Sequence, residues 1–315
     1  MKRVVVTDQA FGGVDRERAT VTGLGADFAE HDCRDEQQTL AAVRGADVAL
    51  VNLAPVTGRV LAVMAPGATV VRYGIGYDNV DVEAARHLGV AVANVPDYGG
   101  DTVADHAVAS LLCLLRRLPA FDRTVRDRGW CRATEIGPLQ RFADTTVGLI
   151  GIGGVGRVVA ARLSALGLQV LAHDPYAGDP DGDGPQLVAL PELLARADAI
   201  SLHCPSTPAT ERLIGPDAFA VMRPGTVLVN TSRGALVDTG ALVDAIASGT
   251  IAAAALDVFD TEPLPPDSVL RDRPEILLTP HAAFYSLGSL AALQRLAADE
   301  VARALQGRPL RCRVA

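Results

Sequence analysis

Three polar residues in the second half of the chain, Arg233, Glu262 and His281, could together act on an anionic substrate by proton transfer. They stand in V-N-T-S-R-G, A-L-D-V-F-D-T-E-P and L-L-T-P-H-A-A, each just past a short apolar run. A guanidinium can clamp a carboxylate, an imidazolium can donate to a carbonyl oxygen, and a neighbouring carboxylate favours the protonated ring. These roles fit the interconversion of a 2-oxo acid and a 2-hydroxy acid. Each residue alone has an ordinary alternative: a surface arginine, a solvated carboxylate or a structural histidine.

A glycine-rich segment gives a second signal. The residues G-I-G-G-V-G at 151–156 follow the apolar run V-G-L-I and precede the helical pattern R-V-V-A-A-R-L-S-A-L. In this context the glycines permit a tight turn, the approach of the backbone to a pyrophosphate and close helix packing, and the helix N-terminus favours phosphate. A glycine-rich turn without a ligand is the alternative. The residues that we predict to bind a dinucleotide here are Gly151, Gly153, Gly154, Val155 and Gly156.

The carboxylate of Asp174 indicates which dinucleotide binds. Asp174 ends the next apolar run, Q-V-L-A-H-D, about 20 residues after the glycines, where a carboxylate can accept hydrogen bonds from the adenosine ribose. A carboxylate repels a 2′-phosphate, and the following Pro175 and Tyr176 offer no cation to receive one. NAD is therefore predicted in preference to NADP. His173 points to the other face of the strand, so we expect it to be structural.

Alternating apolar runs and helical patterns predict an α/β protein. Runs at 4–6, 47–51, 68–72 and 90–94 indicate a first parallel sheet, and P-D-Y-G-G at 96–100 then interrupts the pattern like a hinge. A second series of six strands begins at T-T-V-G-L-I and describes a complete doubly wound nucleotide domain.

The domain prediction follows from these two series and from the last amphipathic helix, which could return to the first series. We predict two doubly wound parallel-sheet domains. A Rossmann NAD-binding domain at 99–286 is inserted into a discontinuous flavodoxin-like substrate domain, residues 1–98 completed by 287–315. The segment 179–185 is expected to be a polar surface loop.

Composition excludes several classes of protein. The chain has 29 Lys and Arg against 37 Asp and Glu, a net charge of −8, which gives no general attraction to nucleic acid or anionic membranes. Lys2 is the only lysine, so Schiff-base and P-loop chemistry are excluded. The five cysteines are scattered, as in a reducing compartment. The start M-K-R-V-V-V-T-D predicts a strand rather than a signal peptide, and no apolar run reaches the ~18 residues that span a bilayer. We expect a cytoplasmic protein.

Together these segments resemble the D-isomer-specific 2-hydroxyacid dehydrogenase family over nearly the whole chain. The resemblance implies an NAD-dependent oxidoreductase whose catalytic residues are Arg233, Glu262 and His281. It also implies that Asp257 of A-L-D-V contacts the nicotinamide carboxamide and that L-H-C-P-S-T borders the adenine. The further residues that we assign to cofactor binding are therefore Asp257, His203, Cys204, Pro205, Thr210 and Thr231, with Pro175 beside Asp174. An adjacent His-Cys pair on a strand faces opposite ways, so no metal site is expected.

The early segment V-V-R-Y-G-I-G-Y-D-N-V-D at 70–81 resembles the substrate loop of the family. In that loop, backbone N–H groups and an arginine hold the substrate carboxylate. An ordinary glycine-rich turn after a strand is the alternative. The residues that we assign to substrate binding are Arg72, Tyr73, Gly74, Ile75 and Gly76, together with Tyr98 of P-D-Y.

Three segments, at 96–98, 103–107 and 280–286, are most similar to the branch related to C-terminal-binding proteins. The chain also departs from its relatives. Gly154 stands where many carry Arg or Asn, and Phe284 stands where the corepressors have Trp. Ile75 replaces the lysine of phosphite dehydrogenases, which disfavours phosphite oxidation.

Two other functions stay open at the level of sequence. One is a dinucleotide-sensing, corepressor-like binding protein, although the complete catalytic trio favours an enzyme. The other is a family dehydrogenase that acts on a phosphonate or an aldehyde hydrate. A homodimer is also expected, because the predicted helix at 101–118 has more apolar surface than one exposed face would carry; burial within one chain is the alternative. The residues concerned are Ala104, Ala107, Val108, Leu111, Leu112 and Leu115.

Overall fold

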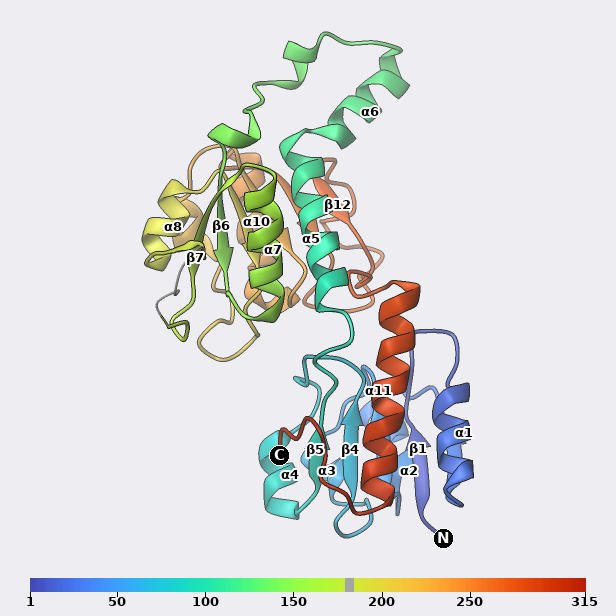
Figure 1. Ribbon diagram of the computed structural model, residues 1–315. Coiled ribbons are helices and arrows are strands. Elements are labelled where there is room, and N and C mark those ends of the chain that lie inside the picture. The colour runs from blue at the N-terminus through green and yellow to red at the C-terminus, as the bar shows by residue number, and fades with distance from the viewer. Residues whose placement is uncertain (179–183) are drawn as a thin grey trace. The chain divides into compact units, whose positions relative to one another are not determined.

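The computed structural model describes residues 1–178 and 184–315, so the polar loop predicted at 179–185 falls mostly outside the described residues. The chain divides into two compact units. Unit 1 consists of Met1–Gly99 and Tyr285–Ala315, and unit 2 consists of Gly100–Phe284. Each unit contains one parallel sheet with helices between its strands, which confirms the predicted α/β class (Figure 1).

Unit 1 is built on a five-stranded parallel sheet in the order β2-β1-β3-β4-β5. The three central strands of the sheet are valine-rich and mostly buried on both faces, as parallel strands between helices require. The strands are β1 (Arg3–Val6), β2 (Asp27–Glu30), β3 (Val48–Val51), β4 (Thr69–Arg72) and β5 (Ala91–Ala93). The helices are α1 (Asp15–Gly23), α2 (Glu36–Val43), α3 (Gly58–Leu61), α4 (Val82–Leu88) and α11 (Leu287–Leu305).

Two apolar clusters fill the faces of this sheet. One contains residues of α2, α3 and α4, and the other contains residues of α1 and α11, which lie side by side (Figure 1). Leu293, Ala297 and Val301 of α11 are buried against the strand residues Val4 and Val6. The C-terminal helix therefore completes the core of unit 1, although the first strands are almost 300 residues away in sequence.

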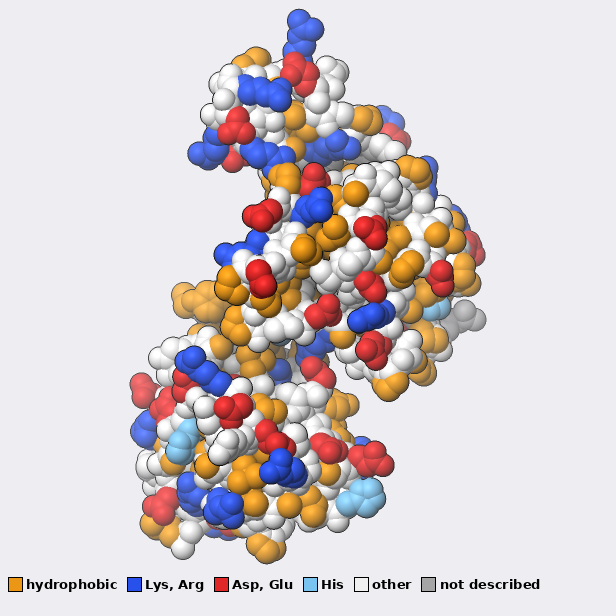
Figure 2. Space-filling view, turned by 180° about the vertical axis from the view of Figure 1, so that it is seen from behind, with side chains coloured by type: hydrophobic (Ala, Val, Ile, Leu, Met, Phe, Trp, Pro, Cys, Tyr) orange, Lys and Arg blue, Asp and Glu red, His pale blue; other side chains and the backbone are white. Residues whose placement is uncertain are grey.

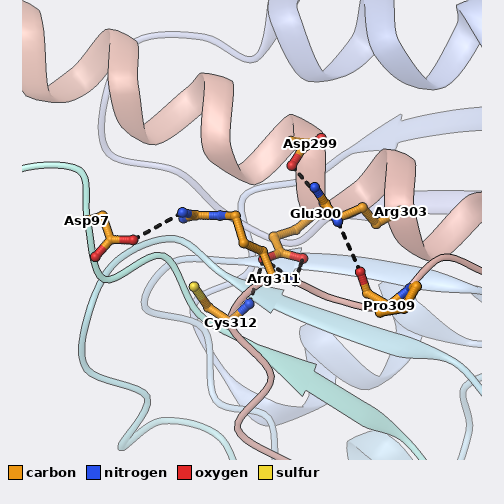
Figure 3. A network of polar contacts seen from close by, with 7 residues as sticks. All are labelled: Asp97, Asp299, Glu300, Arg303, Pro309, Arg311 and Cys312. Carbon is orange, nitrogen blue, oxygen red and sulfur yellow. Dashed lines mark hydrogen bonds and ion pairs between the residues drawn. The ribbon is translucent and has the colours of Figure 1, made fainter.

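The tail after α11 is fixed to unit 1 by a buried carboxylate (Figure 3). Glu300 is fully buried in α11, and its oxygens accept the backbone N–H groups of Arg311 and Cys312 at 3.0 Å. The guanidinium of Arg311 forms an ion pair with Asp97 at 3.0 Å, so the tail also holds the segment that follows β5.

Unit 2 is built on a seven-stranded parallel sheet in the order β12-β11-β10-β9-β6-β7-β8. Its strands are β6 (Thr146–Ile150), β7 (Gln169–His173), β8 (Gln186–Leu187), β9 (Ala199–Leu202), β10 (Thr226–Asn230), β11 (Ile251–Leu256) and β12 (Ile276–Leu278). The two-residue strand β8 was not predicted, because so short a run has no visible periodicity. The order reverses after β6, the first strand, as in a doubly wound nucleotide domain.

Helices cover both faces of this sheet. α5 (Gly100–Leu115) and α7 (Gly154–Ala165) share one apolar cluster, while α8 (Leu190–Arg196), α9 (Pro216–Val221) and α10 (Thr239–Ala247) share the other. Short 3₁₀ turns lie at η1 (Ala133–Ile136), η2 (Phe142–Asp144) and η3 (Gly234–Leu236). No helix among the described residues is long and apolar enough to cross a membrane.

The apolar face of α5 is not exposed, which corrects the reasoning behind the predicted homodimer. Ala104, Ala107, Val108 and Leu111 are buried against the sheet, and Leu112 and Leu115 pack at the edge of the same cluster. The sequence pattern identified a core helix correctly as apolar but could not show what covers it.

A projecting arm follows α5 instead. It runs from α6 (Leu118–Arg128) through η1 and η2 to β6 and extends away from the sheet of unit 2 (Figure 1). None of the α6 residues, all within the described part of the chain, is buried, and the Trp130 side chain is 80% exposed. Basic side chains gather on this arm in the space-filling view (Figure 2).

Candidate active site

Five neighbouring strands of unit 2 stop at the same position along the sheet, so their carboxyl ends are aligned. Ile150 pairs with Leu202, Asn230 pairs with both Leu202 and Leu256, and Leu256 pairs with Leu278. The next residue of each strand therefore emerges at one sheet edge, where ligands of doubly wound folds bind. These residues are Gly151, His203, Thr231, Asp257 and Thr279.

His281 and Glu262 form a direct pair near this edge. Nδ1 of His281 lies 2.6 Å from Oε2 of Glu262, and both side chains are partly exposed. Oε1 of Glu262 accepts the N–H of Phe259 at 2.9 Å, which orients the carboxylate. Because Nδ1 is engaged, Nε2 is the ring nitrogen that remains for a substrate. The two residues predicted as a proton-transfer unit are thus brought together across 19 residues of sequence.

The environment keeps Glu262 ionised. Partial burial raises the pKa of this carboxyl, but the hydrogen bond and charge of His281, the N–H of Phe259 and the charge of Arg233 together outweigh burial. The pKa of Glu262 therefore lies below its ordinary value. The ionised carboxylate accepts the proton on Nδ1 of His281 and so fixes the orientation of the ring.

Arg233 reaches the same region through a tight backbone approach. Its carbonyl accepts Nδ2 of the buried Asn230 at 2.7 Å, and Oδ1 of Asn230 accepts the N–H of Ser232 at 3.0 Å. A side chain at Gly234 would clash with the backbone of Phe259, so glycine lets the loop of Arg233 lie against the loop of Glu262. Asn230 and Gly234 were not predicted as site residues, although both stand in the motif V-N-T-S-R-G that contains Arg233.

His281 itself has an unusual backbone conformation. Its φ of +53° lies in the left-handed region, which few residues other than glycine adopt. Its N–H donates to the carbonyl of Asp257 at 2.7 Å. The carboxylate of Asp257, only 2% exposed, accepts the N–H groups of Ala282 and Ala283 at 2.8 and 2.9 Å. Asp257 thus holds the backbone of His281 and of the two residues that follow it.

The glycine-rich loop has the geometry that its sequence predicts. Gly151 has a φ of +94°, and a Cβ there would lie 2.6 Å from the N–H nitrogen of Cys204. A Cβ at Gly156 would clash with the carbonyl of Gly151. At Gly153 and Gly154 a Cβ would meet no described atom within 4 Å, so the start of α7 is open. Val155 packs against the cluster shared by α5 and α7.

Asp174 lies directly after β7 and next to the glycine-rich loop. Its Oδ2 accepts the N–H of Ile152 at 3.0 Å, and its Oδ1 accepts the N–H of Tyr176 at 2.9 Å. Burial raises the pKa of Asp174, but the backbone N–H donors outweigh it, and the pKa is lowered. The side chain is therefore an ionised acceptor beside the predicted phosphate site. His173 bonds to the carbonyl of Val188 instead, and Pro175 is exposed.

The first two residues after β9, His203 and Cys204, have uncharged side chains. Burial lowers the pKa of His203 to about 4, so its ring is neutral, and burial raises the pKa of Cys204 to about 11, so its thiol stays protonated. Thr210 closes the following loop by donating to the carbonyl of Pro205 at 2.7 Å. In the described chain there is no group of three or more His, Cys, Asp or Glu side chains that could hold a metal ion.

These residues fit a dinucleotide. No side chain of the described residues caps the start of α7, so the N–H groups there are available to a phosphate. Oγ1 of Thr231 at the same sheet edge is buried and has no hydrogen-bond partner within residues 1–178 and 184–315. An open helix N-terminus, an ionised carboxylate that can accept from the ribose and an unsatisfied hydroxyl are polar groups that a dinucleotide can use.

The predicted substrate loop of unit 1 follows β4. Arg72 is buried, and its Nη1 donates to the carbonyl of Tyr73 at 2.6 Å. Gly74 has a φ of +121°, and a Cβ there would clash with the Arg72 guanidinium and lie 3.7 Å from the hydroxyl of Tyr98. Gly74 thus leaves room for this arginine. Ile75 is exposed and its carbonyl accepts Nδ2 of Asn94, while Gly76 is half-buried.

Tyr73 requires a correction. Its side chain is 1% exposed, packs edge-on against Phe11 at 4.9 Å between ring centroids, and donates to the carboxylate of Glu17 at 3.1 Å. The side chain is part of the core of unit 1, and the backbone N–H of Tyr73 donates to the carbonyl of Val51 at 2.8 Å, so neither group is placed to hold a substrate. The alternation of faces along a strand continues through this residue, and Val71 shares its cluster.

Comparison with known proteins agrees with this geometry. Residues 108–283 match the family described as D-isomer specific 2-hydroxyacid dehydrogenase, NAD binding domain. The chain is 41% identical to the D-3-phosphoglycerate dehydrogenase of Mycobacterium tuberculosis over 293 residues, covering 91% of this chain and 54% of that protein. It is 32% identical to the glycerate dehydrogenase of Methylorubrum extorquens, covering 94% of this chain and 96% of that protein.

Solved structures give the same result for the fold. The TT0316 protein of Thermus thermophilus has a TM-score of 0.88 and 32% identity, covering 99% of this chain and all of that chain. The D-lactate dehydrogenase of Aquifex aeolicus, complexed with NAD and lactic acid, has a TM-score of 0.87 and 27% identity, with 96% of each chain covered.

The chain therefore belongs to the D-isomer specific 2-hydroxyacid dehydrogenase family, and its NAD-binding domain is the one that unit 2 contains. The predicted family is confirmed, and so is the predicted NAD chemistry of its cofactor domain. The similarity to the branch of C-terminal-binding proteins stays a prediction. The chain spans about half the length of the first mycobacterial relatives, 54% of each.

Proposed function

We propose that this protein is an NAD-dependent oxidoreductase that transfers a hydride between NAD(H) and C2 of a small 2-hydroxy or 2-oxo acid. The observation that carries the proposal is the 2.6 Å contact between Nδ1 of His281 and Oε2 of Glu262, which leaves Nε2 as a proton donor or acceptor. The names of similar proteins support it, because phosphoglycerate, glycerate and lactate are all 2-hydroxy acids.

Each residue of the trio has a distinct role in the proposed reaction. His281, oriented by Glu262, donates a proton from Nε2 to the carbonyl oxygen of the 2-oxo acid, and it takes the proton back in oxidation. Arg233 clamps the substrate carboxylate and fixes C2 in place. NADH supplies the hydride when it is bound.

The cofactor is held by the residues at the carboxyl edge of unit 2. The glycine-rich loop and the start of α7 would take the pyrophosphate, and Asp174 would accept the adenosine ribose hydroxyls. His203, Cys204, Pro205 and Thr210 would border the adenine, and Thr231 and Asp257 would face the nicotinamide end. On the substrate side, Arg72 and the backbone of residues 74–76 are proposed to bind the anionic group, with Tyr98 beside them.

A panel of 2-oxo acids, followed by the loss of NADH absorbance, tests this proposal. Wild-type protein should reduce at least one small 2-oxo acid, and His281→Ala should lose about 100-fold or more in kcat. His87→Ala, which changes an exposed histidine of α4, is the matched control and should keep full activity. Turnover that His281→Ala leaves unchanged would remove His281 from the mechanism and favour a binding protein that only senses the dinucleotide.

The predicted homodimer is proposed on a different surface from the one expected. The exposed side of the arm carries Leu118, Val125 and Trp130. Unit 2 also contains a groove of about 380 Å³ beneath this arm, lined in part by Leu114, Leu115, Pro138, Leu139, Val227 and Ala253. A projecting element that carries exposed apolar side chains and a groove lined in part by apolar residues can be complementary in a symmetric dimer, because each copy offers both surfaces.

Light scattering at micromolar concentration tests the dimer. Wild-type protein should have twice the mass of the chain, and the double variant Val125→Asp, Trp130→Asp should be monomeric. Leu166→Asp, at an exposed leucine after α7, is the control and should remain a dimer. A monomeric wild type contradicts the proposal.

A further inference from the structure

The segment V-A-D-H-A of α5 brings a second histidine to the loop of His281. Nε2 of His106 lies 3.2 Å from Oγ1 of Thr279, two residues before His281. Oγ1 of Thr279 lies 2.6 Å from Oδ1 of Asp257, while Nε2 of His106 is 3.9 Å from the same oxygen. The threonine hydroxyl therefore stands between the imidazole and the carboxylate, and all three side chains belong to unit 2.

The number of protons on each group determines the direction of the hydrogen bonds that join His106, Thr279 and Asp257. A carboxylate such as Asp257 can only accept, so the single hydroxyl proton of Thr279 is donated to Oδ1. The hydroxyl oxygen must then accept from His106, which requires a proton on Nε2 of that ring. The order of donation is His106 to Thr279 to Asp257.

Asp257 passes this constraint on to His281. The same carboxylate accepts the N–H groups of Ala282 and Ala283, and the Asp257 carbonyl accepts the N–H of His281 at 2.7 Å. His281 has a φ of +53°, a conformation that costs free energy and persists only when neighbouring contacts hold it. The threonine before the histidine and the two alanines after it are thus tied to one buried carboxylate.

We propose that His106 is a positioning residue for His281 and acts through Thr279 and Asp257. By donating to Oγ1 it orients the threonine hydroxyl toward Asp257, and the three-residue chain keeps the imidazole of His281 against Glu262. The assignment rests on the proposed function, because its consequence is the placement of the proton donor. It also gives a role to the V-A-D-H-A segment, which the sequence suggested only as a mark of kinship.

Steady-state kinetics of four variants test the proposal. His106→Leu removes the donor, and kcat should fall about 10-fold, since small displacements of a reacting group cost rate steeply. KM for NADH and NADH affinity by fluorescence should change less than about twofold, because the cofactor contacts are kept. His106→Gln places an amide donor at a similar reach and should restore most of kcat.

Thr279→Val keeps the shape of threonine but removes the hydroxyl, so it should lower kcat to the same degree as His106→Leu. The double variant His106→Leu, Thr279→Val should be no slower than either single variant, because both changes break one chain. A purely structural role predicts the opposite: additive losses, a lower melting temperature in step with activity, and no rescue by glutamine.

The possible failures are distinguishable. If wild-type protein reduces no 2-oxo acid, the proposed function is wrong, and the assignment of His106 falls with it. If wild-type protein turns over and His106→Leu is equally fast, only the role of His106 is overturned. Equal kcat values of His106→Leu and His106→Gln, both below wild type, would overturn it as well.

Discussion

The two units place their backbone N–H groups differently at equivalent sheet edges. In unit 1 the carboxylate of Asp8, just after β1, accepts the N–H groups of Asn52, Leu53 and Ala54 at 3.0, 2.6 and 3.1 Å. The equivalent first strand of unit 2, β6, runs into the glycine-rich loop, and a Cβ at Gly153 or Gly154 would meet no described atom within 4 Å. In unit 1 a carboxylate of the chain accepts these N–H groups, whereas in unit 2 the start of α7 is open.

The comparison shows that a doubly wound fold places backbone N–H donors at the carboxyl edge of its sheet. The sequence determines whether a side chain of the protein or a bound ligand accepts their hydrogen bonds. In unit 1 the buried carboxylate of Asp8 accepts the N–H groups that follow β3, so these donors are used within the protein. Unit 2 substitutes glycines and keeps its carboxylate, Asp174, at the side of the loop, so that the anion can come from a ligand. The cofactor function is therefore expected to reside in unit 2, and changes to the two carboxylates should have different consequences.

The largest expected effect is on the stability of unit 1. Asp8→Ala leaves three backbone N–H groups without their acceptor, which should cost about 3 kcal/mol or more of unfolding free energy. NADH affinity of the folded variant should be unchanged. Urea unfolding and NADH fluorescence titration measure both quantities, and Asp32→Ala, at an exposed ion pair with Arg34, is the control. A loss of NADH affinity without a loss of stability would contradict the comparison.

A smaller effect, and on binding rather than stability, is expected from the carboxylate of unit 2. Asp174→Ala removes charged hydrogen bonds to the ribose worth about 1.5–3 kcal/mol and also removes the repulsion of a 2′-phosphate. NADH should bind more weakly, and the preference over NADPH should narrow. Titrations with both dinucleotides test this, with Asp217→Ala at an exposed carboxylate of α9 as the control. Equal use of NADPH by wild-type protein would show that Asp174 does not select the cofactor.

The two ends of the glycine-rich loop should differ in how well they tolerate an added side chain. Gly156→Ala forces a Cβ onto the carbonyl of Gly151, and the backbone shift should cost about 1–3 kcal/mol, weakening NADH binding roughly 10- to 100-fold. Gly154→Ala points into open space and should bind NADH within about threefold of wild type. The comparison of the two variants is well controlled, because both changes add one methyl group to the same turn. Equal losses in the two variants would mean that the loop is not held as described.

Local sequence signals predicted much of the fold and named the residues of the candidate site. The glycine spacing at 151–156 and the strand that ends at Asp174 are contiguous, so one loop and its neighbour could be placed without the rest of the chain. The trio could also be named, since Arg233, Glu262 and His281 each follow an apolar run that had to end at one sheet edge.

What the sequence could not show depends on packing between distant segments. The pattern of α5 indicated an apolar helix, but only the fold shows that its apolar side lies on the sheet. Tyr73 matched a loop motif, yet its ring continues the alternation of β4 into the core. The tie from His106 to Thr279 spans 173 residues and has no local signature. Such contacts are set by which helix covers which strand, and periodicity carries no information about that.

The dependence of kcat/KM on pH, in wild-type protein and Glu262→Gln, tests the central claim most directly. The pKa of Glu262 is lowered in the folded protein, so the ionised pair, and the stability it contributes, should persist through the ordinary carboxyl range and be lost only as the pH falls below it. Above that range, reduction of a 2-oxo acid needs protonated His281, so its rate should hold at lower pH and fall as the pH rises, while oxidation should show the mirror profile. Glu262→Gln keeps the shape but removes the charged partner of Nδ1, so its kcat/KM should be lower than that of wild type and its profile should lack the acid limb that titration of Glu262 gives. Superimposable profiles for the two proteins would contradict the account, because His281 and Glu262 would then not act as one proton-transfer unit.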